Sequence, residues 1–436
     1  MKLAVVGAGW AGLACAIEAT RAGHVVTLFE AARTPGGRAR RIDATGGVDG
    51  TPLDNGQHIL IGAYTATLAL MREVGVDPAQ VLHRMPLSLR FADGGGLQVP
   101  AHCPAPLDLL AGIVGARGWS WRDKLGLVRA ALRWQRQRFA CAPELSVEAL
   151  CCALTPRVRH ELIEPLCVSA LNTPAEDASA QVFLRVLQDA LFGGRGGADL
   201  LLPRVDLGAL LPDAALRWLV DHGATVRLGH RIQSLIASKN GWRLDDTEVD
   251  RVVLAVAPWD AARLVRGAAL PRADDWLLTA EALRHESIAT VYASAGARRL
   301  AAPMLALRSH AAAPAQFVFD RGRLGGAPGL LAFVVSASNL PREALEHGVL
   351  QQAREQLGLA NVEVLRTVVE KRATFACTPG LQRPAVRIAE GLLACGDYID
   401  GPYPATLEGA VRSGMAVARA IVPATAPDRR EPNARR

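Results

Sequence analysis

The sequence predicts an α/β protein, in which a domain built on a parallel sheet is joined to a second domain of mixed α+β structure. Residues 1–30 alternate between strand, glycine-rich turn, helix and strand, an order typical of parallel-sheet units. Apolar runs at 249–258 and again just before residue 396 have the composition of strands buried on both faces. The helical patterns at 65–76 and 105–139 lie between these strands and indicate the second domain.

The composition is that of a folded protein with more than one domain. A chain of 436 residues corresponds to roughly two or three domains. Half of the residues are hydrophobic and 21% are charged, which excludes wholesale disorder. The 49 Lys and Arg residues against 42 Asp and Glu give a net charge of +7. Because the cations are spread along the chain, we expect no nucleic-acid partner.

Neither the cysteines nor the N-terminal residues predict a metal site or an exported protein. The eight cysteines form no CxxC and no spacing that suits zinc, so no metal is expected and a reducing cytoplasm is favoured. The vicinal pair Cys151–Cys152 is expected on a helix, shielded from solvent. Residues 3–17 imitate a signal peptide, but three regularly spaced glycines argue against that interpretation. No other stretch reaches the ~20 apolar residues that span a bilayer.

The first thirty residues fit a dinucleotide-binding unit of the Rossmann type. A strand at 3–6 leads into GAGWAG at 7–12, followed by a helix over 14–21 and a strand at 24–29 that ends in Glu30. The G-x-G-x-x-G pattern is weak by itself, but this order of elements makes it specific.

Each residue of this motif has a physical role. Gly7 permits a tight turn, Gly9 lets a pyrophosphate approach the backbone, and Gly12 lets helix and strand pack closely. The helix N-terminus favours the negative phosphates. Glu30 is placed to accept hydrogen bonds from a ribose diol and would repel a 2′-phosphate, which disfavours NADP. A glycine-rich turn without a ligand is the alternative.

A second glycine turn distinguishes FAD from NAD. Gly36, Gly37 and Arg38 follow the second strand directly, in a position typical of flavoproteins, where the arginine lies near the phosphates and the glycines lie under the flavin. A simple turn with a surface arginine remains the alternative. The glycine-rich stretch at 193–199 is not framed by a strand and a helix, so it is interpreted as a loop.

Four further patterns carry a resemblance to a known family. They are LDNGQHILIGAY at 53–64, VRLGHRIQSL at 226–235, VDRVVLAVAP at 249–258 and ACGDYIDGPYPATLEGAVRSG at 394–414. Together with the two glycine motifs, they resemble the FAD-dependent amine oxidase and phytoene desaturase superfamily over nearly the whole chain. The run from His58 to Tyr64 is similar to the branch of carotene and squalene-associated desaturases, which includes the hydroxysqualene dehydroxylases.

The resemblance implies further flavin-binding residues. The expected contacts come from Gln57, from the backbone amide of Ile232 near the adenine, from Gly396 and Asp397 at the ribityl chain, and from Thr406 and Leu407 at the start of the last helix. That helix N-terminus would stabilise the negative charge that collects on a reduced flavin. Tyr398 and Tyr403 are expected to line the pocket.

The resemblance also implies a reaction and candidate catalytic residues. The expected activity is the reductive removal of the hydroxyl group of hydroxysqualene, giving squalene for hopanoid biosynthesis. Carotenoid desaturation and amine oxidation, within the same superfamily, are the alternatives. His58 is the first candidate for the proton donor and Asp54 the second. The alternative for His58 is a hydrogen bond to backbone or flavin without proton transfer.

These motifs imply the domain organisation. Segments 1–60, 204–262 and 385–422 are expected to form the FAD-binding domain. Segments 61–203 and 263–384 are expected to form the substrate-binding domain. Residues 423–436 lack apolar periodicity and are predicted to be a disordered tail.

The segment 105–139 predicts contact with a membrane surface. It mixes short apolar runs with Trp119, Trp121, Trp134 and several basic residues, as interfacial helices do. A pair of amphipathic helices packed on the domain core is the alternative. The expected partners are thus a C30 isoprenoid substrate, the surface of the inner membrane and, upstream, the prenyl synthases that supply the substrate.

Overall fold

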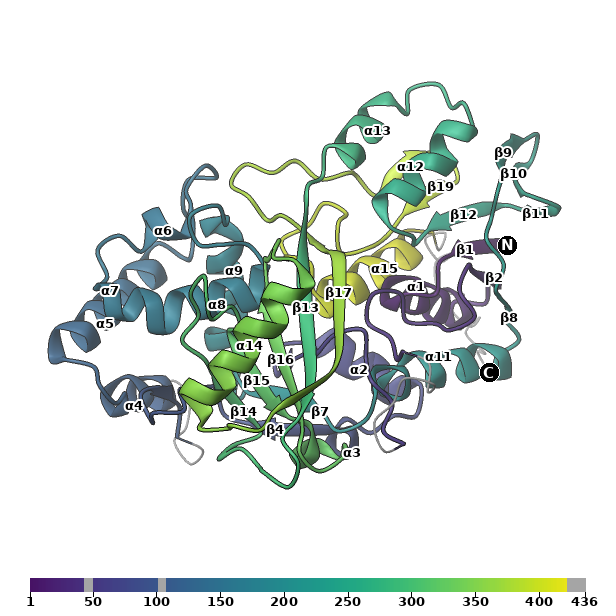
Figure 1. The fold of residues 1–436 in the computed structure, drawn as a ribbon. Helices are drawn as coiled ribbons and strands as arrows, with labels where there is room; N and C mark the ends of the chain where they lie inside the picture. The colour runs from purple at the N-terminus through teal and green to yellow at the C-terminus, as the bar shows by residue number, and fades with distance from the viewer. Residues whose placement is uncertain (43–49, 101–106, 422–436) are drawn as a thin grey trace, which may run out of the picture.

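The computed structural model describes residues 1–42, 50–100 and 107–421. Figure 1 shows three regions from right to left: the parallel sheet with α1 and α15, then the long strands β13 and β17, and finally helices α4 to α9. The tail predicted at 423–436 lies outside the described residues.

A six-stranded sheet forms the nucleotide-binding part, and this confirms the predicted α/β class. Its order is β18-β19-β12-β1-β2-β8, and the five strands from β19 to β8 are parallel. The strands are β1 (Lys2–Val6), β2 (Val25–Glu30), β8 (Thr225–Leu228), β12 (Arg251–Leu254), β18 (Arg387–Ala389) and β19 (Leu392–Ala394). Val6 pairs with both Phe29 and Leu254, so three strands end level with one another and deliver their following loops to one edge.

Helices α1 (Trp10–Arg21) and α15 (Leu407–Ile421) pack side by side beside this sheet. A Cβ at Gly414 would lie 2.1 Å from the Ala11 carbonyl oxygen, so only glycine allows this close approach. Helix α1 begins four residues earlier than predicted because Gly9 already serves as its N-cap. Gly23, with φ of +80°, follows the C-cap as expected.

The predicted strand at 249–258 is shorter in the structure. Strand β11 (Thr247–Val249) belongs to a three-stranded antiparallel meander with β9 (Leu235–Ser238) and β10 (Gly241–Leu244). Only β12 enters the main sheet, and helix α12 (Pro258–Gly267) begins at the proline. Proline is well tolerated at the first position of a helix, where its missing N–H has no partner to lose.

The second part is organised around a five-stranded antiparallel sheet in the order β14-β15-β16-β13-β17. The strands are β13 (His285–Ser294), β14 (Met304–Ala306), β15 (Phe317–Asp320), β16 (Leu330–Ser336) and β17 (Glu363–Phe375). Helix α14 (Arg342–Leu357) covers one face, where Leu345 and Val349 join a buried cluster with Val291. The other face contributes Phe317 and Phe319 to the main core.

Smaller elements complete both parts of the structure. They are β3 (Leu60–Ile61), β4 (Leu82–Met85), β5 (Ser88–Arg90), β6 (Gly96–Gln98), β7 (Leu200–Pro203), α2 (Thr65–Glu73), α3 (Pro78–Val81), α10 (Leu207–Leu210), α11 (Pro212–Asp221) and α13 (Asp274–Glu281). The glycine-rich stretch at 193–199 is a loop that leads into β7, as predicted.

The helical region spans α4 to α9. Its elements are α4 (Leu107–Gly115), α5 (Trp121–Arg136), α6 (Val147–Leu150), α7 (Pro156–Val158), a π-helical turn (Arg159–Ile163), α8 (Glu164–Leu171) and α9 (Ala180–Phe192). The predicted helical pair corresponds to α4 and α5. A capping box, in which Ser120 and Asp123 exchange hydrogen bonds, starts α5.

One expectation about the cysteines is wrong. Cys151 is buried as expected, but Cys152 is exposed, and both follow α6 in a turn instead of lying on a helix. Across the described ranges, no helix is both long and apolar enough to cross a membrane. The same residues contain no group of His, Cys, Asp and Glu side chains that could hold a metal ion.

Candidate active site

A cavity of about 590 Å³ lies at the carboxyl edge of the parallel sheet, between this sheet and the antiparallel one. Loops after β1, β2, β8, β12 and β19 form one wall, and side chains of β13, β15, β16 and β17 form the other. Twelve of the thirteen residues expected to bind a cofactor line it. They are Gly7, Gly9, Glu30, Gly36, Gly37, Arg38, Gln57, Ile232, Gly396, Asp397, Thr406 and Leu407.

The thirteenth residue, Gly12, lies behind the cavity wall. A Cβ on Gly12 would lie 1.8 Å from the Gly7 carbonyl oxygen, so this position allows helix α1 to pack on β1. By contrast, a Cβ on Gly9 would meet nothing closer than the Gly37 Cα at 3.9 Å. Gly9 therefore faces open space at the N-terminus of α1, where unpaired backbone N–H groups favour an anion.

Glu30 closes the cavity near the end of β2. Its two carboxylate oxygens accept hydrogen bonds from the backbone N–H groups of Ala8, at 2.7 Å, and Ala32, at 2.8 Å. These bonds fix the carboxylate at the cavity wall and leave it further lone pairs for hydroxyl donors. Ile232, which follows β8, lines the same end of the cavity.

Arg38 connects the second glycine turn to the C-terminal motif. Its Nη2 donates to Asp397 Oδ1 at 2.5 Å, and its Nη1 donates to the Ala373 carbonyl oxygen at 2.6 Å. Burial by itself would lower the pKa of Arg38, but the adjacent Asp397 carboxylate outweighs this effect and raises it. Arg38 is therefore a permanent cation in the cavity wall. Gly36 and Gly37 have positive φ of +109° and +61°, which glycine adopts without strain.

His58 lies in the cavity wall, and its protonation state follows from its surroundings. Its Nδ1 is 3.0 Å from the Gly56 carbonyl oxygen, which can only accept a hydrogen bond, so Nδ1 carries the hydrogen. Burial, together with the nearby Arg38 cation, lowers the pKa of His58 and keeps the ring neutral. Its Nε2 is then a hydrogen-bond acceptor, which does not fit the expected proton donor.

Asp54 does not line the cavity. Its carboxylate is buried beneath it and accepts a hydrogen bond from the Leu207 N–H at 2.8 Å, while its carbonyl oxygen accepts one from the Tyr292 hydroxyl. Burial raises the pKa of Asp54 to about 7 in spite of the Leu207 hydrogen bond. Asp54 thus makes no direct contact with the cavity that would support its expected catalytic role.

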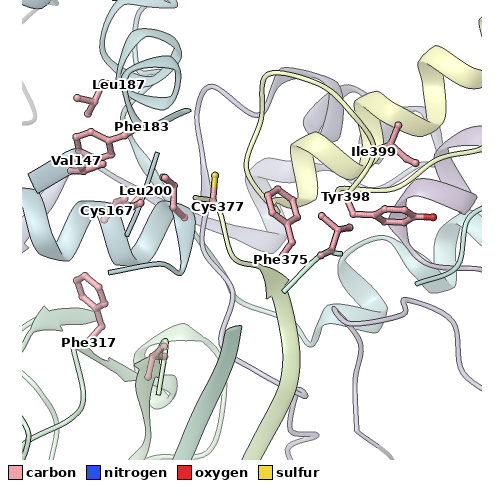
Figure 2. Packing of buried hydrophobic residues seen from close by; sticks show 14 of the residues in the cluster. Val147, Cys167, Phe183, Leu187, Leu200, Phe317, Phe375, Cys377, Tyr398 and Ile399 are labelled. Atoms are coloured by element: carbon pink, nitrogen blue, oxygen red, sulfur yellow. The ribbon is translucent and has the colours of Figure 1, made fainter. Parts of the chain in front are cut away.

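The residues present fit a bound flavin. The Tyr398 hydroxyl is buried in the wall of the cavity and has no hydrogen-bond partner among the described residues. Figure 2 shows this hydroxyl pointing away from Phe375, its neighbour in the hydrophobic cluster. This oxygen is shielded from the cavity as well as from solvent, so the fit to a flavin rests on the glycine turns and on Arg38. The open space beside Gly9 and the Arg38 cation fit a pyrophosphate.

A second cavity of about 200 Å³ adjoins the first and is almost entirely apolar. Phe183, Leu187 and Leu200, which Figure 2 places at the end of the cluster opposite Tyr398, line it together with inner side chains of α4 and α5. Both cavities are lined by Ile59, Tyr64, Ser169, Ala170, Phe317 and Thr406. Tyr403 lines only the apolar one.

Two polar residues that lie at the junction of the two cavities are not among the predicted catalytic candidates. Tyr64 precedes α2, and Thr406 caps α15 by accepting a hydrogen bond from the Gly409 N–H at 3.1 Å. Tyr64 and Thr406 line both cavities. Burial and the nearby Glu408 carboxylate raise the pKa of Tyr64, so its phenol keeps its proton.

The comparison with protein families decides the broad assignment. The chain matches the family "Flavin containing amine oxidoreductase" over residues 10–422, nearly its whole length. The chain belongs to the flavin-containing amine oxidoreductases. It is accordingly an FAD-dependent oxidoreductase, and FAD is the cofactor whose site the glycine motifs form. This confirms the predicted enzyme class and cofactor.

Individual relatives of this flavin-containing family refine the picture. Three proteins named hydroxysqualene dehydroxylase are 24–28% identical over 94–96% of this chain; the one from Rhodopseudomonas palustris is 28% identical and is covered over 98% of its length. Hydroxyneurosporene desaturase of Cereibacter sphaeroides is 36% identical over 27% of this chain and 23% of its own. The crystal structure of an oxidoreductase from Methanosarcina mazei has the same fold, with a TM-score of 0.73 and 18% identity over 96% of this chain and 100% of that one.

Proposed function

We propose that this flavoprotein reductively removes the allylic hydroxyl group of hydroxysqualene, giving squalene and water. The observation that carries the proposal is the apolar cavity that adjoins the flavin site, with Tyr64 and Thr406 as hydrogen-bonding groups at the junction. This arrangement suits a long hydrocarbon that has one hydroxyl group, located at the reacting carbon. The similarity to hydroxysqualene dehydroxylases over about 95% of the chain supports the same substrate.

The chain's own residues would orient the substrate and exclude water. Reduced FAD, when bound, supplies the hydride for this chemistry. Tyr64 donates a hydrogen bond to the departing hydroxyl group, and a proton drawn from solvent along this hydrogen bond would let the group leave as water and restore the phenol. Ile59 and Phe317 line the junction and keep it dry, so that water does not recapture an allylic cation. The neutral His58 accepts a hydrogen bond through Nε2 and thereby contributes to orientation.

The size of the apolar cavity limits how the substrate is accommodated. Its 200 Å³ lies below the ~300–1,000 Å³ of cavities that enclose drug-sized ligands. It therefore holds one arm of a C30 chain whose middle carbon carries the hydroxyl group. The other arm must extend into the larger cavity or displace part of the helical cover. We place the reaction in squalene and hopanoid biosynthesis, after the prenyl synthases that form the C30 chain.

Oxidative desaturation of a carotenoid is the second candidate function. It is favoured by the partial similarity to hydroxyneurosporene desaturase, and an apolar cavity suits either substrate. The two reactions differ in direction, since a desaturase removes hydrogen from its substrate and a dehydroxylase adds it. An amine oxidase is less well supported, because an amine gains nothing from so apolar a cavity.

The direction of the reaction provides the test. The reduced holoenzyme is mixed anaerobically with hydroxysqualene in D₂O, and squalene is measured by mass spectrometry while flavin reoxidation is followed by absorbance. We expect one squalene per flavin reoxidised, with deuterium at the carbon that carried oxygen. No squalene from the reduced enzyme, together with turnover of phytoene or of an amine by the oxidised enzyme, would contradict the proposal.

A further inference from the structure

Helices α4 and α5 present an unusual group of exposed apolar side chains. We call it the α4–α5 patch, and it consists of Leu107, Leu110, Val114, Trp121, Leu125 and Leu132, each between 45% and 67% exposed. At 100° per residue, the three α4 members lie within 60° of one another and the three α5 members within about 40°. Single exposed leucines are ordinary on a protein surface, but a one-sided patch on two adjacent helices marks an interaction site.

The opposite faces of the same two helices line the apolar cavity. Leu109 and Ile113 of α4 and Leu127, Ala131 and Trp134 of α5 all face it. A single layer of helix, about 10 Å thick, therefore separates the α4–α5 patch from the cavity. Figure 1 shows both helices at the end of the molecule opposite the parallel sheet, so the patch is remote from the nucleotide-binding part.

Positive charge is concentrated around the patch. Residues 107–139 contain seven Lys and Arg residues but only two acids, Asp108 and Asp123, a local net charge of +5 against +7 for the whole chain. Asp123 is buried and hydrogen-bonded to Ser120 and Thr155, so it offsets little of this charge at the surface. The exposed cations are Arg117, Arg122, Arg129, Arg133, Arg136 and Arg138.

The α5 arginines border the apolar stripe along one side. On a helical projection they lie between about 60° and 120° to that side of Trp121, and Lys124 alone lies about 60° to the other side. The Lys124 ammonium lies 5.2 Å from the centre of the Trp121 ring and donates a hydrogen bond to the Val114 carbonyl oxygen, which ties the two helices together. An apolar stripe bordered by a row of arginines suits a helix that lies in the plane of an anionic membrane interface.

We propose that the α4–α5 patch docks on an anionic lipid bilayer, with its apolar side chains among the acyl chains and its arginines at the phosphate groups. The charge pattern favours lipid over a second copy of the chain, because a two-fold interface would bring the same cations against each other. The proposal rests on the proposed function in one respect: a C30 hydrocarbon resides in lipid, and docking here brings it within one helix layer of the cavity.

Vesicle flotation of the full-length holoenzyme tests the docking. The vesicles contain phosphatidylcholine alone or phosphatidylcholine with phosphatidylglycerol. We expect binding to the anionic vesicles that weakens as salt increases. The triple variant Leu110→Ser, Trp121→Ser, Leu125→Ser should lower the partition coefficient at least about tenfold. The triple variant Arg122→Gln, Arg129→Gln, Arg133→Gln should lower it about 100-fold on anionic vesicles only.

A matched control separates docking from general loss of hydrophobicity. Leu278 on α13 is 69% exposed, so Leu278→Ser should leave flotation unchanged. Retained flavin absorbance shows that each variant is folded. Equal binding of the wild type and both triple variants, or a wild-type dimer that the apolar variant dissociates, overturns the proposal.

Turnover separates this proposal from the proposed function. With detergent-dispersed hydroxysqualene the triple variants should act like the wild type, and only turnover of vesicle-borne substrate should fall. Vesicle binding without squalene formation from either source contradicts the proposed reaction but leaves the docking surface in place.

Discussion

Arg38 and Asp397, 359 residues apart in the sequence, form an ion pair at 2.5 Å in the wall of the flavin cavity. Arg38 belongs to the second glycine turn and Asp397 to the loop after β19, so the pair joins the two ends of the nucleotide-binding part. The Asp397 side chain is only 8% exposed. A buried carboxylate that loses its partner is costly, so the two motifs depend on each other.

We therefore predict coupling between these two residues in the FAD-free protein. Arg38→Met and Asp397→Asn should each lower the free energy of unfolding, and the double variant should lose less than the sum, with a coupling energy of about 1–3 kcal/mol. Urea denaturation of the wild type and three variants measures it. Asp400→Asn, at a neighbouring exposed acid, serves as the control and should be neutral. Additive losses would show that the ion pair contributes nothing.

Substitutions of Gly9 and Gly12, both in the first glycine motif, should have different effects. Gly9→Val places its side chain in open cavity space, so the protein should fold but bind FAD at least about 100-fold more weakly, since the side chain occupies the place of the pyrophosphate. Gly12→Ala forces a Cβ to within 1.8 Å of the Gly7 carbonyl oxygen and should lower the stability itself. Flavin absorbance and thermal unfolding distinguish the two results. A yellow Gly9→Val protein would falsify the assigned phosphate position.

These local motifs are the part of the site that the sequence predicts well. The roles of Gly7, Gly9 and Gly36 follow from backbone geometry within a few residues, and a short pattern therefore reveals them. The parallel sheet follows from the same strand and turn signals. The start of the strand predicted at 249–258 could not be predicted exactly, because only tertiary pairing decides that Thr247–Val249 joins a meander.

Contacts between distant segments explain what the sequence did not reveal. Glu408 accepts hydrogen bonds from the N–H groups of Ala66, at 3.0 Å, and Thr67, at 2.9 Å, and so connects the start of α15 to the start of α2. In the sequence it is only an acid in the first turn of a helix. Tyr64 is only six residues from His58 in the sequence, but at the junction it lies with Thr406, which is 342 residues away.

Tyr64 should affect turnover and not flavin binding. Tyr64→Phe removes the hydroxyl group at the junction and should lower kcat/KM about 100-fold, typical of a lost hydrogen bond to a reacting group. Tyr403→Phe is the matched control, because Tyr403 lines only the apolar cavity and its hydroxyl accepts a hydrogen bond from Arg185. Single-turnover squalene formation and flavin content are measured for both. Full activity of Tyr64→Phe would remove Tyr64 from the proposed mechanism.

His58 should contribute less to turnover than Tyr64. Because its ring is neutral and its Nδ1–H is bonded to Gly56, His58→Asn should lower turnover by no more than about tenfold and leave the flavin bound. The lowered pKa also predicts that activity of the wild type stays level above about pH 6.5. If activity instead rises as the imidazole takes up a proton, and this limb is lost in His58→Asn, then His58 is the proton donor after all.

Asp54 should give the stability of the protein a clear dependence on pH. Its pKa is raised to about 7 by burial, so the folded state holds a proton that the unfolded state releases near pH 4. Ionisation of Asp54 therefore lowers the free energy of unfolding progressively as pH rises from about 4 to 7, and this destabilisation is complete above that range. Asp54→Asn keeps a side-chain oxygen for the Leu207 N–H but carries no charge. It should raise the free energy of unfolding by about 1–4 kcal/mol at pH 8 and by little at pH 4.

Activity decides whether this carboxyl group has a second role. Since Asp54 lies beneath the cavity wall and not in it, Asp54→Asn should retain most of the wild-type turnover while its melting temperature rises at pH 8. Arg321, whose charge lowers the pKa of Asp54, provides the reciprocal variant. Arg321→Met should raise that pKa further and increase the stabilising effect of Asp54→Asn at pH 8. A variant Asp54→Asn that is stable and yellow but cannot form squalene would instead identify Asp54 as a proton donor that acts through a path the cavity wall conceals.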